Sequence, residues 1–254
     1  MTIRACKSQT RPMRIALALL LLTLSVPISA RAALTPEQRA EVTAIVRDVL
    51  RDPALLREAL RALDADDQRQ TQTATRNAIA MIGARLIDPQ DPVRGNPMGD
   101  VTIVNFYDTR CPYCRQMIPI EAELLRLDPR VRIVDKDLPV LGATSQLEAR
   151  ALLAAQRQGG YYKLQASILK QAAPSTRDTL RADAERLGLD GGRLLRDLDD
   201  AEIKRRLATS LEIADQLSIQ GTPALIVGDQ LLAGAMTLDQ LQQAVAAARR
   251  LPGR

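Results

Sequence analysis

Apolar residues recur at three- and four-residue intervals through residues 33–87, which predicts a helical N-terminal extension. A first helix is expected after Thr35 and Pro36, which together form a helix-start signal. A second is expected after Asp52, and a third, more polar helix is expected over 74–86. Helices this short bury little surface alone, so their apolar faces need a partner. The apolar positions of the first two helices are Val42, Ile45, Val46, Val49, Leu50, Leu55, Leu56, Ala59, Leu60 and Leu63.

After residue 100 the pattern changes to apolar runs typical of buried strands, separated by stretches with helical periodicity. Strands are expected at "VTIVNFY" (101–107) and "RVRIVDKDL" (130–138), with a helix between them. Several helices follow over about 145–217, and then come two short strands, "PALIV" and "QLLAG", and a final helix. This order predicts an α/β fold, in which a mixed sheet is covered by helices and carries an inserted helical block.

Residues 88–100 are dense in proline, glycine, aspartate and asparagine, so they are expected to form a linker. The domain beyond the linker is expected to span 101–250. The apolar faces of 33–87 either fold back onto this domain or pair between copies of the chain. A linker between the two regions favours pairing, so we expect a homo-oligomer assembled through 33–87.

The first 32 residues have the parts of a secretory signal peptide. An apolar run, "IALALLLLTLSVPI", is shorter than the roughly 20 residues that a membrane-spanning helix needs. Small residues at "ARA" (30–32) suit cleavage, so we expect export to the periplasm with cleavage near Ala32. Met13 is an alternative start of this leader. The basic residues that precede the apolar run are Arg4, Lys7, Arg11 and Arg14.

Cleavage of the leader changes the charge and the cysteine content. The whole chain has 35 Lys and Arg and 30 Asp and Glu, and five of the basic residues but no acidic residue lie in the leader. The mature chain is therefore neutral, which argues against nucleic-acid binding. Cys6 is lost, and Cys111 and Cys114 remain. The chain has no histidine, which excludes Ser–His and Cys–His catalysis and histidine-ligated metals.

The sequence "CPYC" (111–114) admits three kinds of chemistry. A zinc site needs four nitrogen or sulfur ligands, whereas one mature chain offers two sulfurs. Two chains that share Cu(I) through four thiolates remain an alternative. A structural disulfide across so short a loop would contribute little stability. The third kind is reversible dithiol–disulfide exchange.

Exchange fits the expected geometry of this pair. Cα atoms three residues apart on a helix lie about 5 Å from one another, within the roughly 4.4–6.8 Å that a disulfide needs. Cys111 lies at the expected helix N-terminus, where unpaired N–H groups and the helix dipole favour the thiolate. Pro112 suits the first helical position. We therefore expect Cys111 to be the nucleophile and Cys114 the resolving thiol.

The run "VNFYDTRCPYCRQMIPI" resembles the strand-to-helix turn of the thioredoxin superfamily, with Pro119 at the position of the proline that kinks that helix. The run "GTPALIV" (221–227) is similar to the cis-proline loop of that superfamily. Further similarities, in "LPVLG", "ALLAAQRQGGYY" and "GDQLLAGAMTLDQL", extend over about 90–250 and indicate the DsbA-like group. The leader and N-terminal helices resemble exported disulfide isomerase-like proteins of the ScsC type, which add an oligomerising stalk.

The resemblance implies roles for the residues of the site. The peptide bond Thr222–Pro223 would be cis and would hold a substrate chain as an added strand beside the cysteines. Pro112 and Tyr113 would tune thiolate stability. Members of the superfamily commonly have a buried acid six residues before the first cysteine, but this position holds Asn105, whose amide cannot take a proton. With Asn105 at the proton-transfer position, the role would pass to Asp108, to water or to no group.

Together these features predict a periplasmic thiol–disulfide oxidoreductase that acts on cysteines of exported proteins and needs no cofactor or metal. Resemblance in the helical extension, in Thr222 and in the "CPYC" motif favours an isomerase or reductase. A DsbA-type dithiol oxidase is one alternative, and a copper-binding protein with Cys111 and Cys114 as ligands is the other. The expected redox partner is a membrane reductase of the DsbD or ScsB type.

Overall fold

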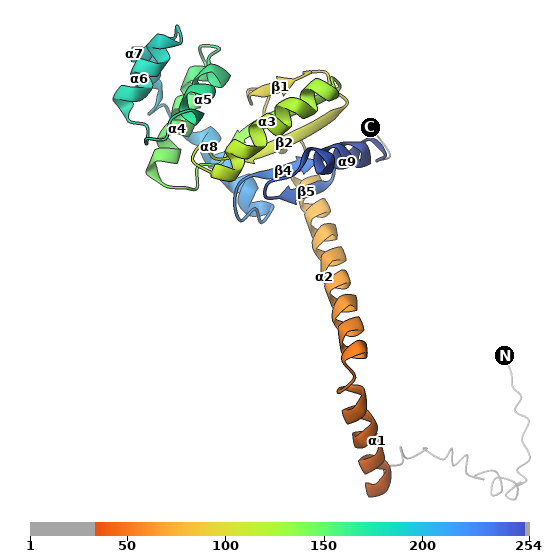
Figure 1. Cartoon of the computed structure of the whole chain (residues 1–254). Coiled ribbons are helices and arrows are strands. Elements are labelled where there is room, and N and C mark those ends of the chain that lie inside the picture. The colour runs from red at the N-terminus through yellow and green to blue at the C-terminus, as the bar shows by residue number, and fades with distance from the viewer. Residues whose placement is uncertain (1–33, 252–254) are drawn as a thin grey trace, which may run out of the picture. The chain divides into compact units, whose positions relative to one another are not determined.

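The computed structural model describes residues 34–251, and the signal peptide expected over 1–32 lies outside them. The described residues divide into two compact units, with the boundary between Arg61 and Ala62. The second unit contains a sheet and most of the helices (Figure 1). No helix among residues 34–251 is both long and apolar enough to span a membrane.

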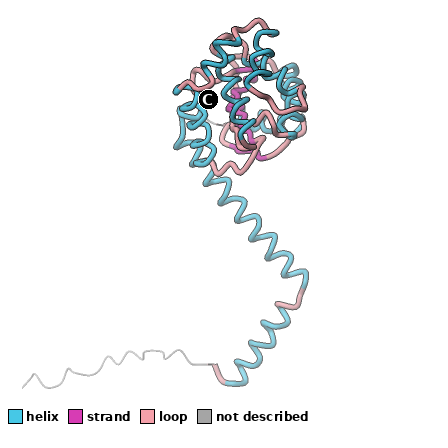
Figure 2. Tube along the Cα trace, turned by 90° about the vertical axis from the view of Figure 1, so that its left-hand side faces the viewer, coloured by secondary structure: helices cyan, strands magenta, loops and turns pink. Residues whose placement is uncertain are grey.

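Helices α1 (Pro36–Val49) and α2 (Pro53–Ile82) begin where the sequence predicts, and a short loop joins them (Figure 2). The Thr35 hydroxyl accepts a hydrogen bond from the N–H of Gln38 at 3.2 Å, which caps α1. The separate helix expected over 74–86 is wrong, because α2 continues to Ile82 and a 3₁₀ turn, Gly83–Leu86, follows. Residues 54–82 contain neither glycine nor proline, so nothing in them interrupts the helix.

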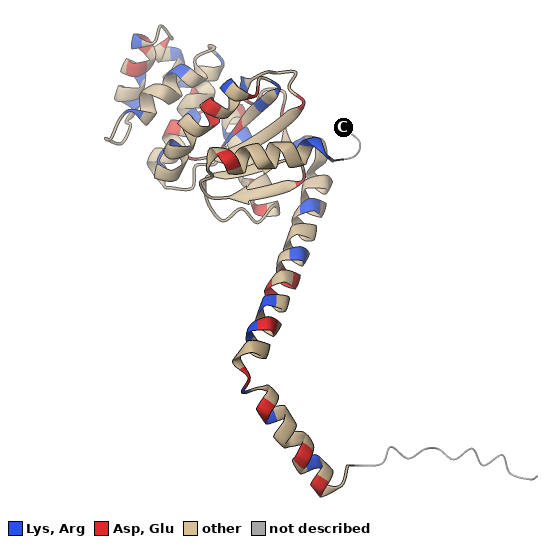
Figure 3. Cartoon of the chain, turned by 45° about the vertical axis from the view of Figure 1, so that its right-hand side comes forward, with Lys and Arg blue, Asp and Glu red and all other residues tan. Residues whose placement is uncertain are grey.

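The apolar residues of α1 and the first part of α2 are exposed. α1 has no buried residue, and the large apolar side chains from Val42 to Leu63 are 40% to 62% exposed. Acidic and basic residues are interspersed with them (Figure 3). We call this set the apolar stripe: Val42, Ile45, Val46, Val49, Leu50, Leu55, Leu56, Leu60 and Leu63.

The sheet has five strands in the order β1-β3-β2-β4-β5. Strands β2 and β3 are parallel, with Val101 opposite Val131, and the other neighbouring pairs are antiparallel. Every second residue of β2 faces helices α3 and α9, and the residues between them face α8 and the end of α2. The strands are β1 (Val93–Gly95), β2 (Val101–Tyr107), β3 (Val131–Asp137), β4 (Ala224–Val227) and β5 (Gln230–Ala233).

Residues 88–100 form part of the sheet domain, in contrast to the expected linker. They include β1, which pairs with β3, and Asp91, whose carboxylate lies 2.6 Å from the ammonium of buried Lys136. A Cβ at Gly99 would lie 2.5 Å from the Arg130 carbonyl oxygen, so the two backbones approach closely. This packing depends on contacts with β3, a strand that lies about 40 residues further along the sequence.

The helical block agrees with the predicted bounds, although it contains one helix that the pattern did not indicate. This helix, α7, begins with a pair of glycines after the N-cap Asp190, whose carboxylate accepts from the N–H of Arg193 at 2.8 Å. Helix α3 precedes the block and α9 follows it. The helices are α3 (Pro112–Leu127), α4 (Ala143–Gln156), α5 (Tyr161–Leu169), α6 (Arg177–Arg186), α7 (Gly191–Asp197), α8 (Ala201–Gln216) and α9 (Leu238–Arg249).

Candidate active site

Cys111 and Cys114 lie where β2 gives way to α3. β2 ends at Tyr107, and a short turn leads to Cys111, which is the N-cap of α3 with an extended backbone (φ −73°, ψ 120°). Pro112 occupies the first turn of the helix, as expected. Both thiols are free and buried, and they pack in one apolar cluster with Tyr107 and the helical block. The pair therefore lies between the sheet and the inserted helices.

A loop distant in sequence completes the surroundings of Cys111. The thiol of Cys111 donates to the carbonyl oxygen of Thr222 at 3.1 Å. The Thr222–Pro223 peptide bond is cis, as the resemblance implied. Strand β4 follows directly and pairs antiparallel with β2, placing Phe106 opposite Ala224. Strand pairing thus brings two segments together that are more than 100 residues apart.

The two cysteines differ in their surroundings. Burial raises the pKa of the Cys114 thiol to about 12, although hydrogen bonds with the Asp108 backbone and the Thr222 side chain act in the opposite direction. Cys114 therefore keeps its proton at neutral pH. Next to it, the side chain of Tyr113 is 58% exposed and available to another molecule.

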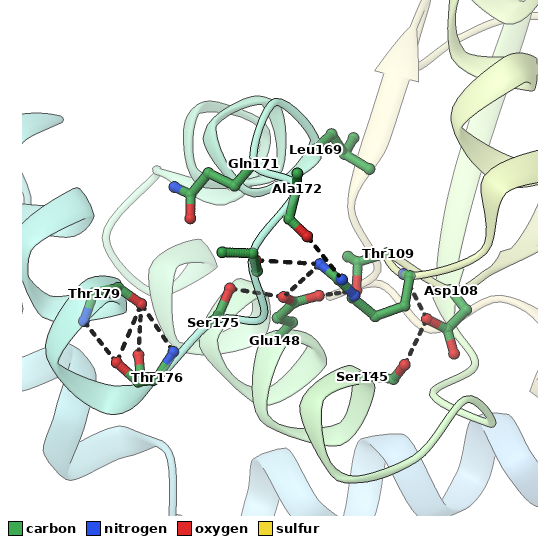
Figure 4. Close-up of polar contacts among 12 residues, drawn as sticks. Asp108, Thr109, Ser145, Glu148, Leu169, Gln171, Ala172, Ser175, Thr176 and Thr179 are labelled. Atoms are coloured by element: carbon green, nitrogen blue, oxygen red, sulfur yellow. Dashed lines mark hydrogen bonds and ion pairs between the residues drawn. The ribbon is translucent and has the colours of Figure 1, made fainter.

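Asp108 is buried and accepts four hydrogen bonds. Its carboxylate accepts from the Arg110 N–H and the Ser145 hydroxyl at 2.8 Å (Figure 4). It also accepts from the N–H groups of Val140 and Leu141 at 3.0 Å. These bonds hold the loop after β3 beside the cysteines. A proton from Cys114 would have to displace one of the four donors, so the geometry favours a structural role for Asp108 over proton transfer.

Asn105 belongs to a buried polar cluster between the sheet and α3. Its amide donates to Asp135 at 2.9 Å, while its carbonyl oxygen has no hydrogen-bond partner among the described residues. Arg94 donates to Asp135 at 2.8 Å and to Glu121 at 2.7 Å, and the hydroxyl of Tyr162 donates to Asp135 at 3.0 Å. The cluster thus contains one guanidinium and two carboxylates.

Glu121 is the unusual member of this cluster. Burial raises the pKa of its carboxyl group to about 7, although Arg94 acts in the opposite direction. One of its oxygens has no partner among the described residues. A proton on Glu121 would balance the single positive charge of the cluster.

A further buried carboxylate, that of Asp137, lies at the end of β3. The hydroxyl of Tyr161 donates to Asp137 at 3.0 Å and lies 2.6 Å from the hydroxyl of Tyr107. Burial raises the pKa of Asp137 to about 7. The Tyr107 hydroxyl, at the end of β2, is thus held by buried groups from α5 and β3, namely Tyr161 and Asp137.

Sequence reasoning missed Glu148, which is fully buried in α4. Its carboxylate accepts from the hydroxyls of Thr109 and Ser175, both at 2.6 Å. The sequence could have indicated that Glu148 is buried, because it lies three and four positions before Ala151 and Leu152 on the apolar face of that helix. Glu121 likewise occupies an apolar-face position of α3. Among residues 34–251, no three Cys, Asp, Glu or His side chains are grouped as metal ligands.

Comparisons with known proteins give one family and several similar structures. Residues 102–246 match the model described as the DSBA-like thioredoxin domain. The chain is similar to a thioredoxin-like oxidoreductase from Silicibacter pomeroyi DSS-3, with 38% identity and a TM-score of 0.62 over 65% of this chain and 96% of that one. It is also similar to a linker-deletion mutant of ScsC from Proteus mirabilis, with 26% identity and a TM-score of 0.63 over 87% and 99% of the two chains.

The curated relatives are much longer proteins. The Na(+)/H(+) antiporter NhaA 3 of Salinispora tropica is 34% identical over 184 residues, which are 68% of this chain and 28% of the antiporter. The chain thus spans about a quarter of the length of the curated relatives it matches.

Proposed function

We propose that this chain, which belongs to the family of DsbA-like thioredoxin domains, is a thiol–disulfide oxidoreductase that acts on cysteines of other proteins. The family and the mixed sheet confirm the predicted resemblance and fold class. The observation that supports the activity most directly is the position of the Cys111 sulfur, 3.1 Å from the carbonyl oxygen that precedes a cis-proline. Cys114 lies one turn along α3, within the same apolar cluster.

In the reducing direction, the Cys111 thiolate attacks one sulfur of a substrate disulfide. A mixed disulfide forms, and the other substrate sulfur leaves as a thiolate that takes up a proton. Cys114 then loses its proton and attacks the Cys111 sulfur. This second step releases the remaining substrate thiol and forms the Cys111–Cys114 disulfide, so two electrons pass to the substrate. The oxidising direction is the reverse of these steps.

The surroundings of Cys114 favour disulfide isomerisation, because net reduction and net oxidation of a substrate both need Cys114 to react. Because burial raises the pKa of the Cys114 thiol to about 12, only a small fraction is thiolate at neutral pH. Attack by Cys114 on the mixed disulfide is then slow. A second substrate cysteine has time to attack instead, which rearranges the substrate disulfide and leaves Cys111 reduced.

The proposed setting is the periplasm, because the leader sequence has the features of a signal peptide. Substrates would be exported proteins with cysteines, held as an added strand beside Thr222 and Pro223. A membrane reductase of the DsbD or ScsB type would keep Cys111 and Cys114 reduced. Pro112 and the exposed Tyr113 would contribute to thiolate stability.

We also propose that the chain forms a homo-oligomer through the apolar stripe. A set of exposed apolar side chains of this size is unusual in a monomer. Assembly would place several Cys111 sites around one misfolded substrate and raise their effective concentration. One site can then hold the substrate while a neighbouring site attacks a wrong disulfide.

Cys111→Ala and Cys114→Ala test the assigned roles. Cys111→Ala is expected to abolish disulfide exchange, whereas Cys114→Ala is expected to accumulate mixed disulfides because their release is lost. The measurement is non-reducing electrophoresis and mass spectrometry of covalent complexes with a scrambled disulfide substrate. If Cys111→Ala traps substrate and Cys114→Ala does not, the assignment of the two thiols is reversed. If wild-type protein exchanges with no disulfide substrate, the proposed function fails.

A further inference from the structure

Glu148 ties the helical block to the two residues that precede the nucleophile. Its carboxylate is fully buried and accepts from the hydroxyl of Thr109 at 2.6 Å, two residues before Cys111. The hydroxyl of Ser175, from the loop after α5, binds the other carboxylate oxygen at 2.6 Å. One acidic side chain thus joins α4, the active-site turn and a loop of the insertion (Figure 4).

Arg110, directly before Cys111, supplies the positive charge next to this carboxylate. One of its terminal nitrogens lies 3.8 Å from the Glu148 carboxylate, and the guanidinium donates to the carbonyl oxygens of Ala172 and Ala173 at 3.3 and 3.5 Å. The Arg110 side chain is 22% exposed, so solvent screens this pair only in part. Two opposite charges are therefore held between the insertion and the turn that carries the nucleophile, in a partly dry region.

Arg115 holds the same loop from within α3. Its guanidinium donates to the Thr109 carbonyl at 3.2 Å and to the Leu169 carbonyl at 3.1 Å. The turn therefore remains attached to the insertion through Arg115 when Glu148 is changed. A substitution at Glu148 is thus expected to change the charge balance of Arg110 more than the backbone conformation of the turn.

We propose that Glu148 is a positioning residue that acts on Cys111 through Arg110. The Glu148 carboxylate offsets the charge of Arg110, and this lowers the tendency of the Cys111–Cys114 disulfide to oxidise other thiols. This inference rests on the proposed function. A cation close to a thiolate stabilises it, and a pair whose reduced form is stabilised is a stronger oxidant. With Glu148 present, the Arg110 charge is balanced, so the turn carries little net positive charge.

The test compares the redox equilibria of variants of the full mature chain with glutathione. Glu148→Gln removes the charge but keeps the size and hydrogen-bonding capacity of the side chain. We expect its equilibrium constant to shift about tenfold toward the reduced dithiol, which corresponds to a reduction potential about 30 mV higher. Arg110→Gln removes the cation and should shift the equilibrium in the opposite direction. The double variant should return close to wild type. Ser175→Ala, which loses a hydrogen bond without a change of charge, should not shift it.

A purely structural role predicts a different pattern. If Glu148 only braces the turn, Glu148→Gln and Arg110→Gln both loosen it and should shift the equilibrium in the same direction. That result, or an unchanged potential in Glu148→Gln, overturns the inference. Should Glu148→Gln fail to fold, Arg110→Gln decides alone, because an equilibrium that is unchanged or moves toward the reduced dithiol refutes it. If the wild-type pair itself does not equilibrate with glutathione, the proposed function fails instead.

Discussion

Glu121→Gln should remove a defined part of the pH dependence of folding stability. In the folded chain, burial raises the pKa of Glu121 to about 7, whereas an unfolded glutamate titrates near 4.3. A group whose pKa is raised on folding stabilises the folded state below its unfolded pKa, and this contribution is lost as pH rises through the folded pKa. Stability from Glu121 is therefore gained as the pH falls from 8 toward 5.

The structure allows a magnitude to be worked out. At pH 8 Glu121 is ionised in both states and adds almost nothing to the pH dependence. At pH 5.5 the folded chain holds a proton on Glu121 that the unfolded chain has mostly lost, which is worth about 2 kcal/mol. Asp137, with a pKa of about 7, adds to the slope of the wild-type chain in the same direction. Glu121→Gln should thus lose about 2 kcal/mol of the wild-type difference between pH 8 and pH 5.5.

Urea unfolding of the reduced chain at the two pH values measures this difference. Glu123→Gln is the matched control on the same helix, because Glu123 is exposed and pairs with Arg126 at the surface. It should leave the wild-type slope between pH 5.5 and 8 unchanged. An unaltered difference in Glu121→Gln would show that Glu121 does not hold a buried proton, and the balance of charge around Arg94 would need another explanation.

Two further predictions concern assembly and packing. Deletion of residues 33–61, which removes most of the apolar stripe, should convert an oligomer into a monomer in light scattering while Cys111 stays reactive toward disulfides; a monomeric full-length mature chain would contradict this. Gly99→Ala should destabilise the chain by about 1–3 kcal/mol in urea unfolding, because the added Cβ would lie 2.5 Å from the backbone oxygen of Arg130. Gly221→Ala is the control, since nothing lies within 4 Å of its added Cβ, and equal losses in both variants would refute the packing argument.

Sequence motifs were sufficient to locate the cysteines and the loop that faces them. The run of apolar residues in 101–107 predicts β2 with its observed bounds, and "CPYC" predicts the start of α3. These elements depend on local properties, namely a short apolar run for the strand and a proline in the first turn of the helix. The Thr222–Pro223 bond was inferred by resemblance and not from local physics.

Tertiary structure alone decided features that depend on distant partners. Strand β1 has three residues and no apolar pattern, so its pairing with β3 exists only because the chain folds back over that strand. Conversely, the sequence pattern did not show that α2 is continuous to Ile82, although residues 54–82 contain no glycine or proline.

The buried polar groups show the same division. Glu121 and Glu148 read in sequence as isolated acidic positions in apolar helix faces. Their partners come from segments far away in the chain: Arg94 for Glu121, and Thr109 and Ser175 for Glu148. A buried carboxylate is tolerated only where donors from other elements converge on it, and this convergence is a property of the folded chain. Local sequence thus identified the candidate reactive cysteines, whereas the folded chain set the charged groups around them.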